Sequence, residues 1–168
     1  MNEISNWVRF CMHKTSTRKG LALDLACGKG RHSLYLSSLG FSVISVDYNE
    51  ENLNCFKGKN ITKLNKDIEN KKNWPLKKIK FDLIIVTNFL NRSIFPLITK
   101  SIKKGGYLIY ETFGEGHQKF GKPKNPDFIL NSKELLTLCS SMELIVYEEV
   151  LSINPSYKSI KHRILSSK

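Results

Sequence analysis

The sequence predicts an α/β fold built on a mostly parallel sheet, and three observations indicate it. Residues 21–47 read as strand, glycine turn, helix and strand, which is one β-α-β unit with two adjacent parallel strands. Strand-like and helix-like apolar patterns then keep alternating along the chain. The last strand-like segments, 142–150 and 159–166, are joined by a short loop holding Pro155, which predicts an antiparallel pair.

The first β-α-β unit also has the residues of a ligand site. The strand at 21–26 runs into a turn with Gly28 and Gly30, where a missing Cβ lets a ligand approach the backbone. The following helix, 31–39, offers free N–H groups at its start. Asp47 ends the next strand, where an acidic side chain is placed to accept hydrogen bonds from two ribose hydroxyls.

The remaining elements follow from periodicity and from capping residues. Residues 3–13 have the pattern of an amphipathic helix, and Asn49 is placed to cap the helix after the second strand. An apolar stripe over residues 94–102 predicts a helix that the Gly105-Gly106 pair ends. The other expected segments are strands at 61–65, 81–86 and 107–113, a long loop at 114–127, and a helix capped by Asn131 or Ser132 with Glu134 in its first turn.

Length and charge limit the possible functions. At 168 residues the chain is expected to form a single domain, with residues 1–19 as an N-terminal helix and linker. The formal net charge is +12, from 27 basic and 15 acidic residues, which allows a nucleic-acid partner. The lysines are scattered, however, and lack the arginine-aromatic pattern used to stack bases, so a solvated basic surface is favoured.

The sequence shows neither a membrane segment nor a metal-binding pattern. No apolar run approaches the roughly 20 residues that a membrane span needs, and the first residues lack the apolar region of a signal peptide. We therefore expect a cytoplasmic protein without a membrane partner. The four cysteines form no C-x-x-C pair, which predicts buried free thiols and no metal site.

Two cofactor classes use such a β-α-β unit, and the turn separates them. A dinucleotide fold prefers Gly or Ala at the third motif position, which here is Ser33. Asp24 in the first strand attracts an ammonium group but offers nothing to a pyrophosphate. The segment Asp24-Leu25-Ala26-Cys27-Gly28-Lys29-Gly30 resembles the first motif of class I S-adenosylmethionine (SAM) methyltransferases, acid-x-Gly-x-Gly-x-Gly, with Ala26 in place of the first glycine.

The order of the elements resembles the whole class I methyltransferase core. That core is a Rossmann-like, seven-stranded, mostly parallel sheet whose antiparallel last strand is inserted between two others. Several segments are similar to small bacterial proteins related to tellurite-resistance methyltransferases, namely Asp24 to Leu34, Tyr110-Glu111-Thr112-Phe113, Phe120-Gly121 and Asn125-Pro126-Asp127-Phe128. The resemblance covers nearly the whole chain and implies a SAM-dependent methyltransferase.

The resemblance implies contacts with the methionine part of SAM. The backbone of the glycine turn is expected to line it, through Ala26, Cys27, Gly28 and Gly30. Asp24 is expected to attract the ammonium group, directly or through water, and Asn88 to bring its backbone close to the same group.

The resemblance also implies contacts with the adenosine part. Asp47 is expected to take the ribose hydroxyls, and Tyr48 to lie near the adenine face. Asp67 is expected to accept a hydrogen bond from the adenine amino group, and the Ile68 N–H to donate one to the adenine ring. The alternatives are a turn aspartate at position 47 and a loop aspartate at position 67.

The residues for the methyl acceptor are less defined. The segment Thr87-Asn88-Phe89-Leu90 lacks the prolines that base N-methyltransferases carry there, and no loop supplies the cysteine nucleophile of a cytosine-C5 enzyme. Ligands of open α/β sheets bind at the carboxyl ends of the strands. The candidates at that edge are Arg31, Glu111 and His117 for catalysis and Phe89, Arg92, Thr112 and Phe120 for substrate binding.

Two histidines have competing interpretations. His117 is either a general base or, as we favour, a surface histidine of the loop at 114–127. His32 is expected to pack or to bond locally in the first turn of its helix. The loop itself either closes over SAM or stays mobile at the surface.

Three function classes remain open from the sequence. The favoured one is a methyltransferase that acts on a small molecule, with a soft anion, a thiol or a carboxylate-type acceptor. The alternatives are an RNA or protein methyltransferase that uses the basic surface, and a SAM-binding module without catalysis or a NAD-type oxidoreductase. Because SAM is already an activated methyl donor, positioning supplies most of the acceleration and few catalytic residues are expected. Neither the acceptor nor the oligomeric state follows from the sequence.

Overall fold

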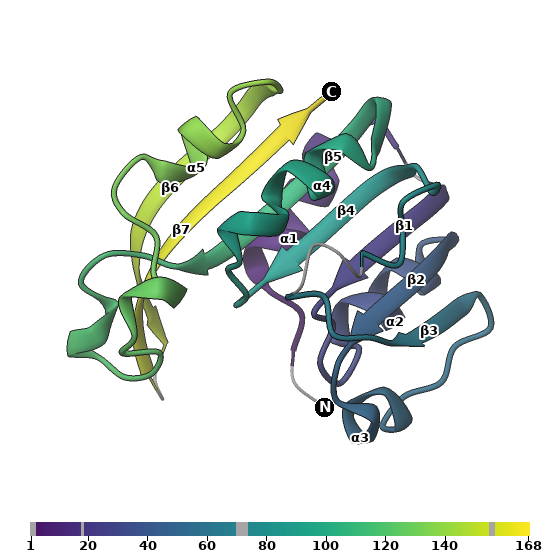
Figure 1. Ribbon diagram of the computed structural model, residues 1–168, viewed down its shortest axis with the longest axis horizontal. Coiled ribbons are helices and arrows are strands. Elements are labelled where there is room, and N and C mark those ends of the chain that lie inside the picture. Colours follow the sequence, from purple (N-terminus) through teal and green to yellow (C-terminus); the bar gives the residue numbers. More distant parts are fainter. Residues whose placement is uncertain (1–2, 18, 70–73, 155–156) are drawn as a thin grey trace.

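One sheet organises the computed structural model, which describes residues 3–17, 19–69, 74–154 and 157–168 (Figure 1). Within these residues, seven strands are ordered β3-β2-β1-β4-β5-β7-β6. Their bounds are β1 Gly20–Leu25, β2 Phe41–Asp47, β3 Ile61–Asn65, β4 Phe81–Thr87, β5 Ile102–Phe113, β6 Glu143–Asn154 and β7 Tyr157–Ser167. The order confirms the predicted α/β class, with the last strand inserted between β5 and β6. Pro155, expected in the loop between the last two strands, lies outside the described residues.

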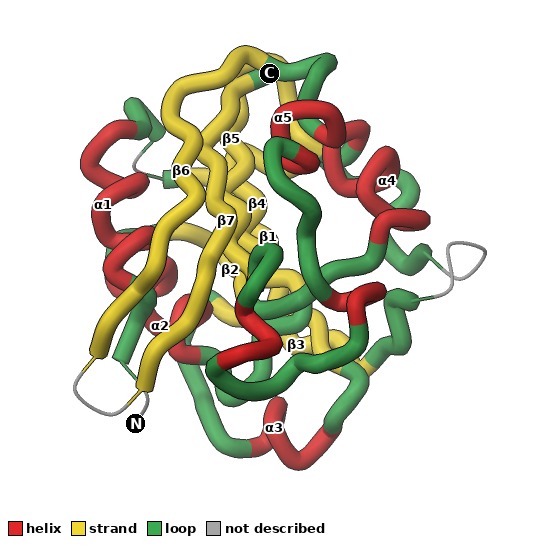
Figure 2. Tube along the Cα trace, turned by 90° about the vertical axis from the view of Figure 1, so that its left-hand side faces the viewer, coloured by secondary structure: helices red, strands yellow, loops and turns green. Residues whose placement is uncertain are grey.

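Helices cover both faces of the sheet, α1 and α2 on one side and α4 and α5 on the other (Figure 2). The helices are α1 Asn6–Lys14, α2 Arg31–Ser38, α3 Glu50–Asn54, α4 Phe95–Lys100 and α5 Glu134–Leu138. Trp7, Val8 and Leu36 pack on the first face, while Ile98 and Leu135 pack on the second. Burial on both faces explains why the central strands are continuously apolar. Every helix in the described parts of the chain is too short or too polar to span a bilayer.

Strand pairing sets which polar side chains become neighbours. β1 pairs in parallel with β2 and β4. β7 runs antiparallel to β5, so Glu111 lies opposite Arg163 and Phe113 lies opposite Lys161. Directly opposite residues lie close enough for their side chains to interact.

The predicted end of the fourth helix is wrong. α4 ends at Lys100, and Ile102 already pairs with Phe81 at the start of β5. The Gly105-Gly106 pair therefore lies inside a strand. A Cβ at Gly106 would be 3.0 Å from the carbonyl oxygens of two β4 residues, so this glycine allows a close approach of the two strands.

Caps explain where the other helices begin. Asn49 accepts a hydrogen bond from the Asn52 N–H at 3.1 Å, which confirms the predicted cap of α3. The residue before α5 is Lys133 rather than Asn131 or Ser132, and its side chain makes no cap bond. The carboxylate of Glu134 nevertheless accepts the Asn131 N–H at 2.8 Å, as expected for one half of a capping box.

Candidate functional site

The glycine turn after β1 brings open backbone to the carboxyl edge of the sheet. Gly28 and Gly30 have φ values of 53° and 72°, in the left-handed region that favours glycine. A Cβ at Gly28 would meet nothing within 4 Å, whereas a Cβ at Gly30 would lie 2.5 Å from the Phe56 ring. Gly28 therefore faces free space, and Gly30 is required by packing.

Ala26 carries the one departure from the expected motif, and it adopts the conformation of the glycine that it replaces. Its φ of 55° is costly for a residue with a Cβ. The next residue, Cys27, donates its N–H to the Val46 carbonyl at 2.9 Å. This bond fastens the turn to β2 and holds Ala26 in its left-handed conformation.

Asp47 connects the glycine turn to the end of β2. Its side chain is buried, one carboxylate oxygen accepts the Gly28 N–H at 2.7 Å, and the other accepts the Asn49 N–H at 2.9 Å. Each oxygen has a second lone pair for a further donor. The carboxylate is therefore oriented by the backbone and retains capacity for a ligand.

A cavity of about 700 Å³ opens beside this carboxylate, and we call it the β2–β3 cavity. It is lined by Ala26, Asp47, Tyr48, Asn65, Lys66, Asp67, Ile68, Glu69 and Phe89. Tyr48 is 76% exposed, while Ile68 is buried at the cavity wall. The structure therefore brings together five of the residues expected around a cofactor: Ala26, Asp47, Tyr48, Asp67 and Ile68. Phe89, expected on the acceptor side, lines this cavity instead.

Asp24 lines neither this cavity nor the one described next. Its buried carboxylate accepts a hydrogen bond from the Ser33 hydroxyl at 2.6 Å, and Ser33 accepts one from Ser45 at 2.7 Å. Burial raises the pKa of Asp24 to about 6, although the hydrogen bonds from Ser33 oppose this shift. The contact with an ammonium group stays a prediction that this geometry does not support, because Asp24 instead holds α2 against β1.

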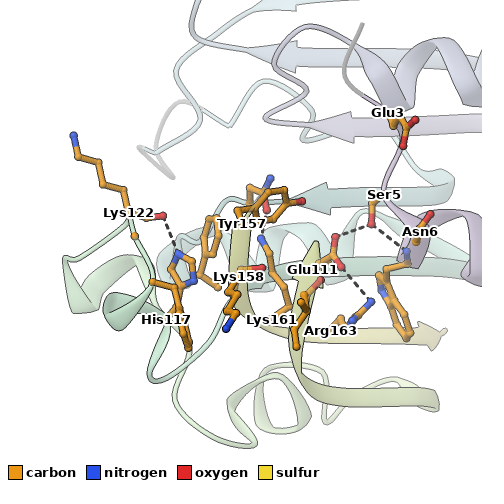
Figure 3. A pocket seen from close by; sticks show the side chains of 18 of the residues that line it. Glu3, Ser5, Asn6, Glu111, His117, Lys122, Tyr157, Lys158, Lys161 and Arg163 are labelled. Carbon is orange, nitrogen blue, oxygen red and sulfur yellow. Dashed lines mark hydrogen bonds and ion pairs between the residues drawn. The ribbon is translucent and has the colours of Figure 1, made fainter. Parts of the chain in front are cut away.

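A second cavity, of about 680 Å³, lies over the ends of β5 and β7, and we call it the β5–β7 cavity (Figure 3). The segment Glu3–Trp7 and the loop residues Phe120–Lys122 border it. Of the expected residues it brings together Arg31, Asn88, Glu111, His117 and Phe120. It also contains Ser5, Trp7, Lys161 and Arg163, which the sequence did not single out.

Glu111 is the buried carboxylate of the β5–β7 cavity, and two partners hold it (Figure 3). One oxygen accepts the Ser5 hydroxyl at 2.7 Å, and the other lies 3.5 Å from the Arg163 guanidinium. Arg163 also lies 3.4 Å from Glu148 and packs 5.3 Å from the Trp7 ring. These contacts fix the Glu111 carboxylate in the cavity wall and pair it with the charge of Arg163.

His32 fixes the N-terminal segment over the cavity. Its Nε2 accepts the Ser5 N–H at 3.2 Å, so its partner lies on a distant segment rather than in its own helix. Burial, with a smaller effect from Arg31, lowers the pKa of His32 to about 3, and the imidazole is neutral. Arg31 in turn donates to the Glu3 carbonyl at 3.2 Å.

His117 is not a surface histidine, and that interpretation is wrong. Its side chain is buried and stacks on Phe113, with ring centroids 4.2 Å apart. Because a carbonyl oxygen only accepts, Nε2–H donates to the Lys122 carbonyl at 2.8 Å. Nδ1 has no hydrogen-bond partner among the described residues. The structure therefore places His117 in the cavity wall, where its hydrogen bond to Lys122 closes the loop.

Arg92 and Thr112 line neither cavity. Arg92 forms a paired contact with Glu134, at 2.5 and 2.9 Å, and donates to the carbonyls of Asp127 and Ile129 at 2.8 Å. Arg92 thus fastens the loop that precedes α5. Thr112 is buried, and its hydroxyl has no partner among the described residues.

Consecutive residues at the end of β4 line the two cavities. Asn88, with a φ of 56°, lines the β5–β7 cavity, while the next residue, Phe89, lines the β2–β3 cavity. The Asn88 N–H donates to the Glu111 carbonyl at 2.8 Å, and the Asn88 side-chain oxygen accepts a hydrogen bond from Lys161. Two consecutive residues at the end of β4 therefore separate the linings of the two cavities.

Comparison with known proteins identifies the family. The model of the tellurite resistance protein TehB matches residues 12–154. A Haemophilus influenzae protein named "Probable S-adenosyl-L-methionine-dependent methyltransferase TehB" is 43% identical over an alignment of 98 positions, and the match covers 51% of this chain and 33% of that protein. The chain thus spans only part of the length of this relative.

Solved structures show the same fold. The crystal structure of TehB from Haemophilus influenzae has a TM-score of 0.77 and 25% identity, over 98% of this chain and 62% of that one. A SAM-dependent methyltransferase from Methanosarcina mazei has a TM-score of 0.76 and 18% identity, over 99% of both chains. The second match shows the fold alone. Together with the family match over residues 12–154, the comparison establishes that the chain belongs to the TehB family.

Proposed function

We propose that the chain is a methyltransferase that binds SAM in the β2–β3 cavity and methylates a small molecule held in the β5–β7 cavity. The observation that carries the proposal is the Asp47 carboxylate, which the Gly28 N–H orients at the edge of a cavity. The names of the TehB relatives support the same cofactor.

The residues of the β2–β3 cavity fit an adenosine group. The free lone pairs of Asp47 suit the two ribose hydroxyls. The exposed Tyr48 ring offers a face for adenine, and Asp67 offers a carboxylate for its amino group. The free space beside Gly28 leaves room for the chain that continues from the ribose.

The division into two cavities supports a transfer reaction. When bound, SAM supplies an activated methyl group on its sulfonium. The chain holds the adenosine on one side of the Asn88–Phe89 boundary and the acceptor on the other. The segment Glu3–Trp7, fixed through His32 and Glu111, borders the β5–β7 cavity. Positioning of this kind supplies most of the acceleration of a simple displacement.

The size and charge of the β5–β7 cavity favour a small anionic acceptor. Its volume, about 680 Å³, lies within the roughly 300–1,000 Å³ of small-molecule sites. The basic side chains that line it are Arg31, Lys122, Lys158, Lys161 and Arg163, and the acidic ones are Glu3 and Glu111. This excess of positive charge attracts anions. Tellurite, which the family description names, is a small oxyanion of this class.

Methyl transfer to a panel of acceptors tests the proposal. The protein is incubated with radiolabelled SAM and either tellurite, selenite, mercaptoacetate, transfer RNA or a protein lysate, and the demethylated product is measured. We expect turnover with at least one small anion. Turnover only with RNA, steeply dependent on salt, would support the basic-surface alternative. SAM binding without turnover on any acceptor would indicate a non-catalytic module.

A further inference from the structure

Lys161 is a buried lysine that lines the β5–β7 cavity. The residue is 8% exposed and lies opposite Phe113 in the pairing of β5 with β7. Its Nζ is 3.4 Å from the centroid of the Phe113 ring and donates a hydrogen bond to the side-chain oxygen of Asn88. A ring face and a carbonyl oxygen thus orient the ammonium group.

The charges around Lys161 leave its ammonium without a carboxylate partner. Glu111, the buried carboxylate of this cavity, is taken by Ser5 and Arg163. Among the described residues, no carboxylate oxygen lies within 4.0 Å of the Lys161 Nζ. Burying an ammonium group without such a partner is costly, and a bound anion would offset that cost.

The pKa of Lys161 reflects the same environment. Burial, with smaller effects from the nearby cations Arg31 and Arg163, lowers it to about 8, and Glu111 opposes the shift. An anion bound beside Nζ would therefore stabilise the protonated form.

We propose that Lys161 binds an anionic group of the methyl acceptor and so selects anions over amines. The inference rests on the proposed function, and it assigns the acceptor class to one residue. The Phe113 face and the Asn88 oxygen are the groups that would recognise an amine. Here the ammonium of the chain itself occupies them, so an amine acceptor finds both groups taken and a cation beside them.

The position of Lys161 suits this role. Asn88 is at the boundary of the two cavities, and the next residue, Phe89, lines the proposed cofactor cavity. An anion bound to Lys161 is therefore held next to the boundary across which the methyl group is transferred. The described hydrogen bonds engage one of the three N–H groups of the ammonium, and the Phe113 ring covers one side of it, which leaves donor capacity for a ligand.

The test measures how tightly two thiols of similar size bind to the wild-type protein and to two variants. Mercaptoacetate carries a carboxylate and 2-mercaptoethanol is neutral, and tellurite serves as an inorganic probe. Each is titrated into the complex with demethylated SAM product by calorimetry. In Lys161→Met we expect mercaptoacetate and tellurite to bind roughly tenfold or more weakly, with 2-mercaptoethanol and the SAM product unchanged. Lys104→Met, at an exposed lysine near the other end of β5, is the control and should match the wild type.

A rescue experiment separates charge from structure. Propylammonium added to Lys161→Ala should restore part of the anion affinity, whereas propanol should not. If Lys161→Met and Lys161→Ala fail to fold, the wild-type protein still tests the inference, because its anion affinity should fall as the pH rises through about 8.

Several results would overturn the inference. They are an anion affinity that Lys161→Met leaves unchanged, a pH-independent affinity in the wild type, and a wild type that binds neither mercaptoacetate nor tellurite. Failure of the proposed function is distinguishable, because it appears as absent binding of SAM and of its product. The anion titrations on the free protein then still report on Lys161.

Discussion

The β2–β3 cavity and the β5–β7 cavity are built in different ways. One edge of the first is formed by Ala26, in a left-handed conformation, and by the Asp47 carboxylate, which a hydrogen bond joins to Gly28, 19 positions away. The second consists of charged side chains from distant segments. Ser5 and Glu111 are 106 positions apart, and Asn88 and Lys161 are 73 positions apart. The glycine turn and Asp47 belong to a single β-α-β unit, although residues after β3 and β4 complete their cavity. The contacts of the second cavity form only once β4, β5 and β7 are paired.

This difference separates the two tasks that we propose. A backbone cradle recognises a cofactor part that does not change, and the chain forms it from one short motif. We expect the long-range side-chain contacts to decide which acceptor fits, so that substitutions there change the acceptor and leave the cofactor site intact. The predictions that follow test whether the two regions are separable.

The largest expected effect is on SAM binding. Asp47→Ala removes a charged acceptor for two hydroxyls and should weaken SAM binding by about 1.5–3 kcal/mol, or roughly 10–150-fold. Calorimetric titration measures it, and circular dichroism confirms that the variant is folded. Lys104→Met serves as the unaffected control. Wild-type affinity in a folded Asp47→Ala variant would show that Asp47 is only a turn residue.

A pair of variants tests the different roles of the two glycines in the turn after β1. Gly30→Ala places a Cβ 2.5 Å from the Phe56 ring and should destabilise the fold by about 2–3 kcal/mol. Gly28→Ala meets nothing within 4 Å and should cost about 1 kcal/mol of stability, but it fills space that we propose for SAM. Urea unfolding and SAM titration should therefore rank the two variants in opposite orders. The same order in both measurements would contradict the distinction.

Asp24 lines neither cavity, and a substitution there tests how its buried charge affects stability. Its folded pKa, about 6, lies above its ordinary value of 3.8, so its contribution to stability is present at low pH and is lost as the pH rises between these values. Asp24→Asn removes the charge and should raise stability by about 1–3 kcal/mol near pH 8. Near pH 4 the difference should vanish. Thermal unfolding across this range measures it, and a pH-independent difference would rule out the buried charge as the cause.

The smallest expected effect is at Ala26. Its left-handed conformation costs about 1 kcal/mol, which Ala26→Gly relieves, although the greater entropy of unfolded glycine offsets part of the gain. We expect a net increase of about 0.5 kcal/mol in the free energy of unfolding. Denaturant unfolding detects it when both proteins are measured side by side. A clear loss of stability would indicate that the Ala26 methyl group makes a packing contact worth more than the strain.

Much of the fold was predictable because its signals are local. The segments that form β1, β2 and β4 are short apolar runs bounded by turn residues. Asn49 caps a helix through a residue only three positions away. The prediction failed at Ile102, which fits the helical stripe in sequence but pairs with Phe81 in the sheet. A helical period does not show that a neighbouring strand will take the last residue of the stripe.

The candidate site divides along the same line. Asp47 and Gly28 were predictable because the residues between them follow a known spacing. Lys161 and Arg163 were not, because their neighbours depend on the register between β5 and β7. Their spacing of two, shared with Ser159, was the available signal that they point to one face of a strand. That signal does not show which residues face them.

Binding of SAM is the central claim, and calorimetric titration of the wild-type protein tests it most directly. The protein is titrated separately with SAM, with its demethylated product and with NAD. We predict one molecule of SAM or of its product bound per chain, with NAD giving no heat of binding. Binding of NAD with none of SAM would contradict the account and would assign the Asp47 site to a dinucleotide.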